Sequence, residues 1–352
     1  MMSVCLHPHC TDPQNPDNQR ACRSCGAKLL IKSRYRALQP IQMGKFIRTF
    51  KGVDTAFSAS APIQLKQILL PEEILKNSAN RQRAIEIFKQ SVAALHTLKD
   101  VPNLQTPIDY SVVGNGLYLI EALPHGSTLS ELLQNQSYLT ESQIQKLLGD
   151  LLPALQTLHE SSLLHRDIQP EHILYSHHSG TFTLINFGFP QLIAEMMQDS
   201  ILKAGEYLIG DPAYSAQEQL TGKATFASDL YSLGVVCLQA ATGIEPTYLL
   251  DYQGKHWNYQ DYLTHNSLSP AFRKILEKMA APLLLDRYAN IKLLLKDLKQ
   301  LDASATAQPV TQSGPQQAAE KALHWLVNAA LPSFNVVQEK AIHIANQFSK
   351  PK

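Results

Sequence analysis

The sequence has no long apolar stretch, no excess of charge of either sign and only five cysteines. No segment approaches the roughly 20 apolar residues that a membrane helix needs, so no membrane span is expected. The first residues are polar and do not form a charged-then-apolar leader, which predicts a cytoplasmic protein. The 31 Lys and Arg balance the 30 Asp and Glu to a formal charge of +1. This balance disfavours a nucleic-acid binder that relies on bulk charge.

The remaining composition is that of a folded protein with more than one part. The chain has 352 residues, of which 44% are hydrophobic, and this fraction is enough for a packed core. At roughly 150 residues per domain, the length allows two domains with additional segments.

Four of the five cysteines lie within the first 25 residues, in the spacing C-x4-C-x11-C-x2-C, at Cys5, Cys10, Cys22 and Cys25. The second pair is followed by Gly26 and is typical of a knuckle, a turn that lets two sulfurs face one ion. Two such pairs give the tetrahedral thiolate cage of a structural Zn²⁺ site. Residues 1–30 are too few to bury a core of their own, so metal binding would supply the folding free energy. The sequence therefore predicts a small zinc-ribbon-like module.

Other uses of these cysteines stay open at this point. Two disulfides are an alternative that the lack of an export signal disfavours, and redox sensing and incidental thiols are the others. His7 and His9 lie between the first two cysteines, where either could replace a thiol ligand, although four thiols suffice. Cys237 lies in an apolar run and is expected in the core.

The hydrophobic periodicity favours strands first and helices later. Apolar and polar residues alternate between residues 29 and 68, and a strand signal recurs at residues 117–123. Between them, residues 80–98 have apolar positions at helical spacing. From Thr140, which begins a capping box, the chain is mostly helical.

A strand-rich half followed by a helix-rich half predicts an α+β fold with two lobes. We expect a domain at residues 34–300, with an N-terminal lobe at 34–120 and a C-terminal lobe at 124–300. A linker rich in Ser, Ala, Thr, Gln and Pro follows at 302–317, and an amphipathic helical tail at 318–352.

Two short segments carry the strongest functional signal. Residues His165–Leu174 read H-R-D-I-Q-P-E-H-I-L and resemble the protein-kinase catalytic loop, H-R-D-L-x-x-x-N. Residues 184–188 read L-I-N-F-G and resemble the metal-binding D-F-G segment. Supporting matches follow in the family's order: Ile63–Lys66 for the V-A-I-K strand, Gly210–Glu218 for the end of the activation segment, Asp229 with Gly234 for a buried helix, and Arg287 for the partner of Glu218.

A four-cysteine segment that runs directly into such a domain resembles the cyanobacterial four-Cys serine/threonine protein kinases. The resemblance covers residues 1 to about 300 and implies a two-lobed kinase fold. It also implies an activity, the transfer of phosphate from Mg·ATP to protein hydroxyls, in which the protein mainly positions groups and neutralises charge.

The resemblance assigns a role to each matching residue. Asp167 would accept the proton of a substrate hydroxyl, Arg166 would bind a phosphorylated activation segment, and His165 belongs to the same catalytic motif. Lys66 would contact the α- and β-phosphates, and Gly44 is the glycine kept from the G-x-G-x-x-G loop. The scaffold residues are Glu218, Asp229 and Arg287.

The positions that should hold Mg²⁺ carry other side chains. Asn186 stands at the D-F-G aspartate, and His172 stands at the catalytic-loop asparagine. Mg²⁺ prefers oxygen ligands with anionic charge, whereas these residues offer a neutral carbonyl and a nitrogen. Unit charges about 4 Å apart interact by about 4 kcal/mol at an effective dielectric of about 20, so losing the carboxylate should cripple metal-dependent transfer. Further departures are Gln169 for the usual lysine, Ser91 for the helix glutamate, and Glu121 at the back of the adenine pocket.

Several departures at the nucleotide site beside an intact scaffold predict a pseudokinase, because function depends on the site rather than on the fold. We expect weak or no binding of Mg·ATP, a structural zinc ion, and a scaffold or allosteric role toward other kinases or signalling proteins. The alternative is an active, atypical serine/threonine kinase that uses Asp167 and Lys66. A third hypothesis, nucleic-acid binding by the zinc module, is disfavoured by the neutral charge, so no nucleic-acid partner is expected.

Overall fold

The computed structural model describes residues 2–56, 61–189, 192–193, 211–251, 254, 256–263 and 266–306. The chain divides into two compact units, Met1–Leu301 and Asp302–Lys352. The last helix, α10 (Ile291–Thr306), covers the first residues of the predicted linker. The rest of the linker, the predicted tail at 318–352 and Gly210 lie outside the described residues. Within the described part, no helix is both long and apolar enough to cross a membrane.

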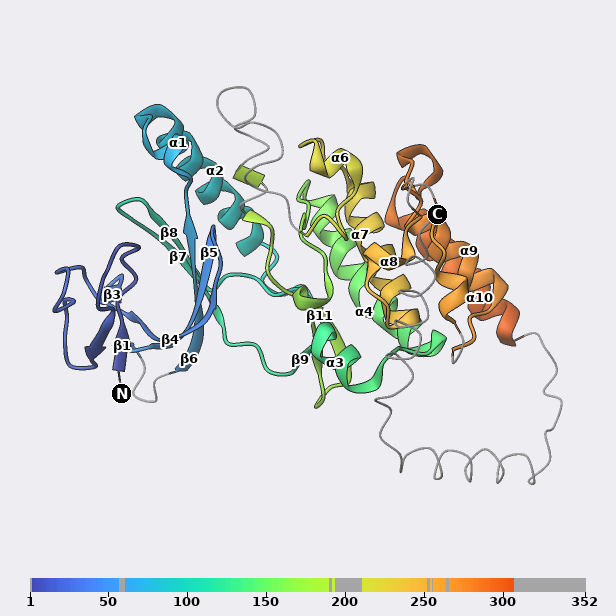
Figure 1. The fold of residues 1–352 in the computed structure, drawn as a ribbon, viewed down its shortest axis with the longest axis horizontal. Coiled ribbons are helices and arrows are strands. Elements are labelled where there is room, and N and C mark those ends of the chain that lie inside the picture. The colour runs from blue at the N-terminus through green and yellow to red at the C-terminus, as the bar shows by residue number, and fades with distance from the viewer. Residues whose placement is uncertain are drawn as a thin grey trace, which may run out of the picture. The chain divides into compact units, whose positions relative to one another are not determined.

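An antiparallel sheet forms the N-terminal lobe (Figure 1), with strand order β3-β4-β5-β6-β8-β7. Its strands are β3 (Leu30–Ile31), β4 (Tyr35–Met43), β5 (Ile47–Asp54), β6 (Ala61–Leu69), β7 (Asp109–Val113) and β8 (Gly116–Ala122). Two helices, α1 (Glu72–Leu75) and α2 (Ser78–His96), lie between β6 and β7. The predicted strand region at 29–68, the helix at 80–98 and the strand at 117–123 are confirmed.

The two faces of this sheet are covered by different parts of the chain. Along β6, Ile63 and Leu65 point to an outer face, where they join a cluster with Val4 and Leu6. Ile68 points to the opposite, inner face and joins the large core that includes α2 and the helical lobe. Because successive strand residues alternate between faces, Lys66 lies on the inner face with Ile68.

The cysteine segment packs on the outer face of the sheet. Its two short strands, β1 (Met2–Val4) and β2 (Gln14–Pro16), pair with each other. The Arg36 guanidinium on β4 donates to Ser3 Oγ at 2.6 Å and to the Gln19 carbonyl at 3.1 Å. Residues 2–30 therefore share a core with the N-terminal sheet and belong to the same compact unit as that sheet.

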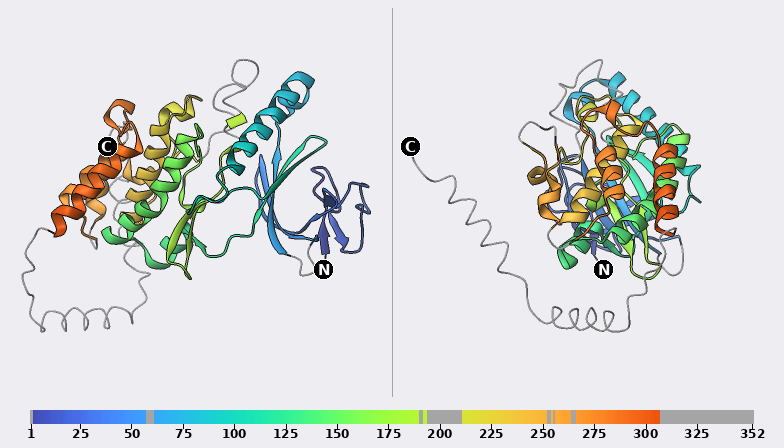
Figure 2. Two further views of the ribbon diagram at one scale, coloured as in Figure 1. Left: turned by 180° about the vertical axis from the view of Figure 1, so that it is seen from behind. Right: turned by 90° about the vertical axis from the view of Figure 1, so that its right-hand side faces the viewer.

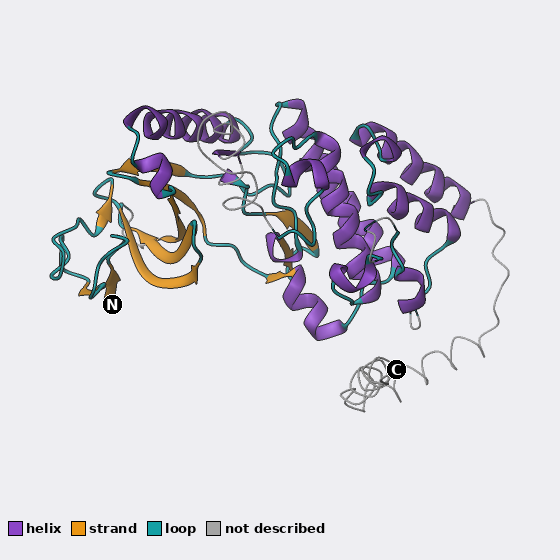
Figure 3. Ribbon diagram, turned by 45° about the horizontal axis from the view of Figure 1, so that its top comes forward, coloured by secondary structure: helices purple, strands orange, loops and turns teal. Residues whose placement is uncertain are grey.

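The C-terminal lobe is helical around one small sheet (Figures 2 and 3). Its α-helices are α3 (Leu129–Gln136), α4 (Glu141–Glu160), α6 (Gln217–Leu220), α7 (Phe226–Thr242), α8 (Pro246–Leu249), α9 (Pro270–Met279) and α10. Short 3-10 turns are η1 (Pro170–His172), η2 (Tyr259–Tyr262) and η3 (Leu284–Asp286), and the sheet has the order β11-β10-β9 from β11 (Thr181–Leu184), β10 (Ile173–Ser176) and β9 (Ser127–Thr128).

Local sequence signals account for the central helices of this lobe. Thr140 and Gln143 cap the start of α4 reciprocally, as predicted. Helix α7 is buried along almost its whole length, and Cys237 is in its core as expected. A Cβ at Gly234 would lie 2.7 Å from Met279 Cβ and 2.8 Å from the Ala280 nitrogen. Glycine at this position therefore allows α7 to approach α9 closely.

Candidate functional site

The segment that resembles a catalytic loop is held in place by one buried carboxylate. Asp229, on α7, accepts hydrogen bonds from the backbone nitrogens of His165 and Arg166, both at 2.9 Å, and from His159 Nε2 at 2.8 Å. Burial by itself would raise the pKa of Asp229, but these hydrogen bonds, with His159 the largest contributor, hold it below its usual value. Arg166 has φ = 67°, a left-handed backbone that these bonds support.

The same loop is tied to the segment that resembles D-F-G. The His165 ring donates from Nε2 to the Ile185 carbonyl at 3.1 Å, and the Gly188 nitrogen donates to the His165 carbonyl at 2.9 Å. Burial lowers the pKa of His165 to about 4, so its ring is neutral at pH 7. With 1% of its surface exposed, His165 holds two segments together and does not line an open site.

Asp167 lies in a small hydrogen-bonded group with two neighbours. The Gln169 amide donates to Asp167 Oδ1 at 3.1 Å. His172 Nδ1 lies 2.7 Å from the Asp167 carbonyl oxygen, 3.2 Å from Gln169 Nε2 and 3.3 Å from Asp167 Oδ2. The Ile185 nitrogen donates to the His172 carbonyl at 3.0 Å, which places Asn186 next in the chain beside His172. Asn186 also has a left-handed backbone, with φ = 64°.

Lys66, the predicted phosphate-binding lysine, forms a buried ion pair with Glu121 on β8. The two side chains are 6% and 4% exposed. Gln64 is directly opposite Glu121 in the register of β6 and β8, and it also donates to Glu121 Oε2, at 3.2 Å. Lys66 is two residues further along β6 on the same face, so it reaches Glu121 diagonally across the strands.

Helix α2 supplies no acidic partner to Lys66 among the residues that the structure describes. Ser91, at the position of the family's glutamate, turns its hydroxyl back onto its own helix and donates to the Ile87 carbonyl at 2.9 Å. Glu86 is exposed and accepts from Gln90 at 3.1 Å, so it faces away from the sheet as its helical position predicts. The carboxylate near Lys66 thus comes from the sheet and not from the helix.

Gly44 lies at the β4–β5 turn, where its nitrogen donates to the Ile47 carbonyl at 2.9 Å. A Cβ at this position would lie 2.7 Å from the same carbonyl oxygen. The close approach of the two backbones explains this glycine without a phosphate. The other positions of the turn carry side chains.

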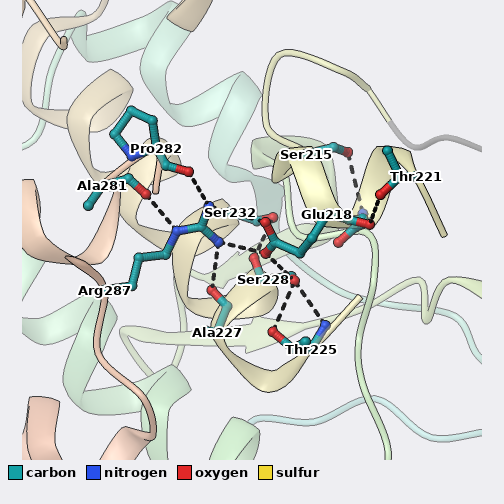
Figure 4. Close-up of polar contacts among 11 residues, drawn as sticks. Ser215, Glu218, Thr221, Thr225, Ala227, Ser228, Ser232, Ala281, Pro282 and Arg287 are labelled. Atoms are coloured by element: carbon teal, nitrogen blue, oxygen red, sulfur yellow. Dashed lines mark hydrogen bonds and ion pairs between the residues drawn. The ribbon is translucent and has the colours of Figure 1, made fainter. Parts of the chain in front are cut away.

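The predicted scaffold residues form a network behind the site (Figure 4). Arg287 Nη1 donates to Glu218 Oε1 at 2.7 Å, and Ser228 donates to the same oxygen at 2.6 Å. The remaining guanidinium nitrogens donate to the carbonyls of Ala281 and Pro282, at 2.6 and 2.7 Å. Burial opposes ionisation of Glu218, but Arg287 and Ser228 hold its pKa below the usual value. The network joins α6, α7 and the loop before α10.

The four N-terminal cysteines converge on one point. Their sulfurs all lie within 4.8 Å of one another, with Cys5 and Cys25 at 3.5 Å and Cys10 and Cys22 at 3.6 Å. A tetrahedron with Zn–S bonds of about 2.3 Å has edges of about 3.8 Å, so the spacing fits a zinc ion. The same spacings are far longer than a disulfide bond of about 2.05 Å.

The backbone around Cys22 is arranged to favour its thiolate, whereas burial raises the pKa of the Cys5 and Cys10 thiols. Gly26, with φ = 73°, donates to the Cys22 carbonyl at 2.9 Å and closes the predicted knuckle. Burial would raise the pKa of Cys22, but hydrogen bonds from the Cys25 backbone and from Asn15 lower it to about 6. A lowered pKa favours the thiolate form of Cys22, and the thiolate is the form of cysteine that binds zinc. His7 and His9 are exposed and outside this cluster.

Of the residues assigned to the nucleotide site, the structure joins Asp167 and His172 in one hydrogen-bonded group, whereas it pairs Lys66 with Glu121. Asp167, His172 and Asn186 lie close along hydrogen-bonded segments, as their motifs indicate. The pairing of Lys66 with Glu121 was not predicted. A signal existed in the sequence, since Gln64 and Lys66 are polar residues in one largely apolar strand and Glu121 lies near the end of another. Only the strand register shows that they meet.

Comparison with known proteins agrees with this fold. The protein kinase domain family matches residues 62–303, a range that begins after the β4–β5 turn. The chain is 27% identical over 306 residues to "Serine/threonine-protein kinase B" from Synechocystis sp., covering 85% of this chain and 52% of that protein. It is 31% identical over 222 residues to "Serine/threonine-protein kinase PknA" from Nostoc sp., covering 62% of this chain and 38% of that protein. The chain thus spans about half or less of these relatives.

Among solved structures, the chain is similar to "PpkA-294 apo form", with a TM-score of 0.59 and 20% identity. The match covers 75% of this chain and 96% of that one. At this identity the likeness concerns the fold alone.

Proposed function

Since the chain belongs to the protein kinase family, we propose that it is a pseudokinase that binds Mg·ATP weakly or not at all and acts by binding other signalling proteins. The observation that carries the proposal is the replacement of both metal-binding residues of the family. Asn186 stands at the position of the acidic ligand, and His172 stands at the position of the asparagine. A neutral carboxamide does not offset the charge of a dication held against a triphosphate. The nitrogen of His172 nearest Asp167 is already engaged with that residue.

Two further contacts support impaired nucleotide binding. The ammonium of Lys66, which would meet the α- and β-phosphates, is neutralised by Glu121 in a buried pair. A phosphate must compete with this carboxylate, or bind beside it against its negative charge. Gln169, in place of a lysine, donates to Asp167 and adds no positive charge to the site.

Thermal unfolding of the full chain with ATP and with ATP plus Mg²⁺ tests this proposal. Mg·ATP at one hundred times its Kd would stabilise the protein by about 2.7 kcal/mol, whereas we expect no measurable shift at millimolar nucleotide. Lys66→Met is the matched control, because any shift that persists in that variant does not arise at this site. A strong shift that requires Mg²⁺ and Lys66 would overturn the proposal.

A second candidate function is an active, atypical serine/threonine kinase. The Lys66–Glu121 pair is the observation in its favour, because Glu121 could replace the missing helix glutamate and orient the lysine. Asp167 is also present to accept the proton of a hydroxyl. Radiolabel transfer from ATP that disappears in Asp167→Ala would support this function, and equal background in both proteins would remove it.

We further propose that the four cysteines hold a structural zinc ion in the assembled protein. Cys5, Cys10, Cys22 and Cys25 would be its ligands, and the ion would fix the loops that pack on the outer face of the sheet. A cytoplasmic location, in which thiols stay reduced, is compatible with this use.

A further inference from the structure

The outer face of the N-terminal sheet carries a row of polar residues that the kinase fold does not account for. Arg48 on β5 is opposite Gln67 on β6, Gln67 is opposite Tyr118 on β8, and Tyr118 is opposite Ser111 on β7. Four neighbouring strands thus place four polar side chains in one line, on the face opposite Lys66. Gln67, Tyr118 and Ser111 are 1%, 6% and 8% exposed.

These four residues line a pocket of about 1120 Å³ between the sheet and the cysteine segment. One wall comes from the loops that carry the cysteines, at His7–His9 and Ala27–Ser33. The other comes from the β7–β8 turn at 113–116 and from residues 69–75. Lys45 and Phe46, in the β4–β5 turn beside Gly44, also line the pocket, while its other lining residues lie outside those assigned to the nucleotide site.

Gln67, which lines this pocket, has one buried polar atom without a partner in the described part of the chain. The Gln67 amide nitrogen donates to the Leu6 carbonyl at 2.8 Å and to the Tyr118 hydroxyl at 3.0 Å. The Leu6 contact fixes the orientation of the amide, because a carbonyl accepts only from the nitrogen side. Gln67 Oε1 is then buried without a hydrogen bond to any residue that the structure describes. A buried acceptor of this kind costs free energy unless a ligand or water donates to it.

The charge of the lining favours an anionic ligand. The pocket is lined by four cations and two carboxylates: Lys28, Lys32, Lys45, Arg48, Glu72 and Glu73. Lys32 is paired with Asp109 at 2.6 Å. The side chain of Arg48, at the end of the polar row, has no hydrogen bond or ion pair within the described part of the chain.

We propose that this pocket binds an acidic peptide segment of a partner protein. The row of polar residues on the sheet forms the floor of the pocket. An acidic peptide supplies a backbone N–H that can donate to Gln67 Oε1 and a carboxylate that can pair with Arg48. The volume exceeds the 300–1000 Å³ that is usual for small-molecule pockets, and apolar residues such as Leu30, Leu69 and Val113 suit the side chains between acidic ones. Because the cysteine loops form one wall, the site depends on the zinc module being folded.

A displayed library of random dodecapeptides, selected on the full zinc-loaded chain, is the probe for this site. We expect the selected peptides to be rich in Asp and Glu, and their binding to weaken with added salt. Reversing the charge of Arg48 on the floor, or of Lys28 on the opposite wall, should each reduce their affinity about tenfold. Lys299→Glu, an exposed cation on α10, is the matched control and should leave affinity unchanged.

Each of the other outcomes overturns the proposal. These are selected peptides without acidic enrichment, equal binding by Arg48→Glu, Lys28→Glu and Lys299→Glu, or no peptide with a Kd below about 1 mM. Tighter binding of a single-stranded oligonucleotide that requires Arg48 would assign the pocket to nucleic acid instead. Equal melting temperatures and zinc contents of the three variants establish that each is folded.

Discussion

Lys66 and Glu121 form a buried ion pair within a single sheet, two positions apart in the register of β6 and β8. Helix α2 has Ser91 where a glutamate would reach across to the lysine, and that serine bonds only to its own helix in the described structure. The position of Lys66 is therefore set by strands that cannot move separately. Neither partner of this pair lies on α2, so the pair does not depend on an acidic residue from that helix.

Because this pair is buried, removing its carboxylate should lower the free energy of unfolding far more than removing an exposed carboxylate. Glu121→Gln leaves the Lys66 ammonium buried without its counter-charge, and we expect a loss of about 3 kcal/mol in the free energy of unfolding. Glu72→Gln is the control, since Glu72 pairs with Lys76 at 3.5 Å on the surface, and it should change stability by less than about 0.5 kcal/mol. Urea denaturation measures both.

A double variant separates the missing charge from lost packing. Lys66→Met combined with Glu121→Leu removes both charges and fills a similar volume, so it should restore most of the stability lost in Glu121→Gln. If Glu121→Gln proves as mild as Glu72→Gln, the pair is solvated and does not fix Lys66.

Much of this fold follows from local signals in the sequence. The capping box at Thr140 fixes the start of α4, and the helical spacing in residues 80–98 predicts α2, because both depend on neighbouring residues only. The positions of Asp167 and Asn186 follow from short motifs. These features need no knowledge of which strands pair.

The missed features all depend on contacts between distant segments. The Lys66–Glu121 pair needs the register of β6 and β8, which lie about fifty residues apart, and a shift of one residue would turn Glu121 to the other face. The packing of Val4 and Leu6 on the sheet was likewise missed, since the short alternation of Met2, Val4 and Leu6 does not indicate which surface these side chains contact. The spacing of the four cysteines predicted a module at residues 1–30 but not the core that this module shares with the sheet.

Restoring the family's metal ligands should restore Mg·ATP binding if their absence is the main defect. We expect Asn186→Asp with His172→Asn to bind Mg·ATP at least about tenfold more tightly than the parent protein, because a carboxylate and a carboxamide then face the metal. Without Mg²⁺ the added negative charge should weaken ATP binding instead. Displacement of a fluorescent ATP analogue, with and without Mg²⁺, measures both effects.

The control for this experiment is Asn135→Asp, which adds the same charge on α3 at an exposed position. It should leave nucleotide binding unchanged in either condition. An unchanged affinity in the double variant would show instead that Lys66, held by Glu121, or the β4–β5 turn limits binding.

The buried ring of His165 predicts that stability falls as the pH drops from about 6.5 to 4. In this window the unfolded chain binds a proton at His165, with an ordinary pKa of about 6.5, whereas the native pKa of about 4 keeps the folded ring neutral. The unfolded state thus gains protons first, and about 3 kcal/mol of stability is lost across the window. The lowered pKa values of Asp229 and Glu218 add losses at still lower pH.

Urea denaturation at a series of pH values tests this slope. His165→Gln, which keeps a donor for the Ile185 carbonyl but does not titrate, should be less stable at pH 7 and much flatter between pH 6.5 and 4. His96→Gln, at the exposed end of α2, should keep the full slope. If stability falls with pH in His165→Gln as steeply as in the parent, the native ring takes up its proton as readily as the unfolded one.

The cysteine cluster predicts that zinc stabilises the N-terminal lobe as a whole. Val4 and Leu6 flank Cys5 and belong to the core of the outer sheet face, so loss of the metal should release apolar contacts of the sheet as well as the loops. We expect one zinc per chain by elemental analysis, and a strong chelator should lower the melting temperature by more than about 5 °C.

Variants of single cysteines distinguish zinc binding from a general loss of stability when any cysteine is replaced. Cys22→Ser should lose the zinc and melt like the chelated protein, because three thiolates and a hydroxyl bind Zn²⁺ far more weakly. Cys237→Ala, in the buried core of α7, should also be less stable but should keep one zinc per chain and its response to the chelator. Two outcomes would mean that the four thiols do not hold a structural ion: full zinc content in Cys22→Ser, or no effect of the chelator on the melting temperature of the parent protein. The packing of residues 2–6 on the sheet would then be sufficient to fold this segment.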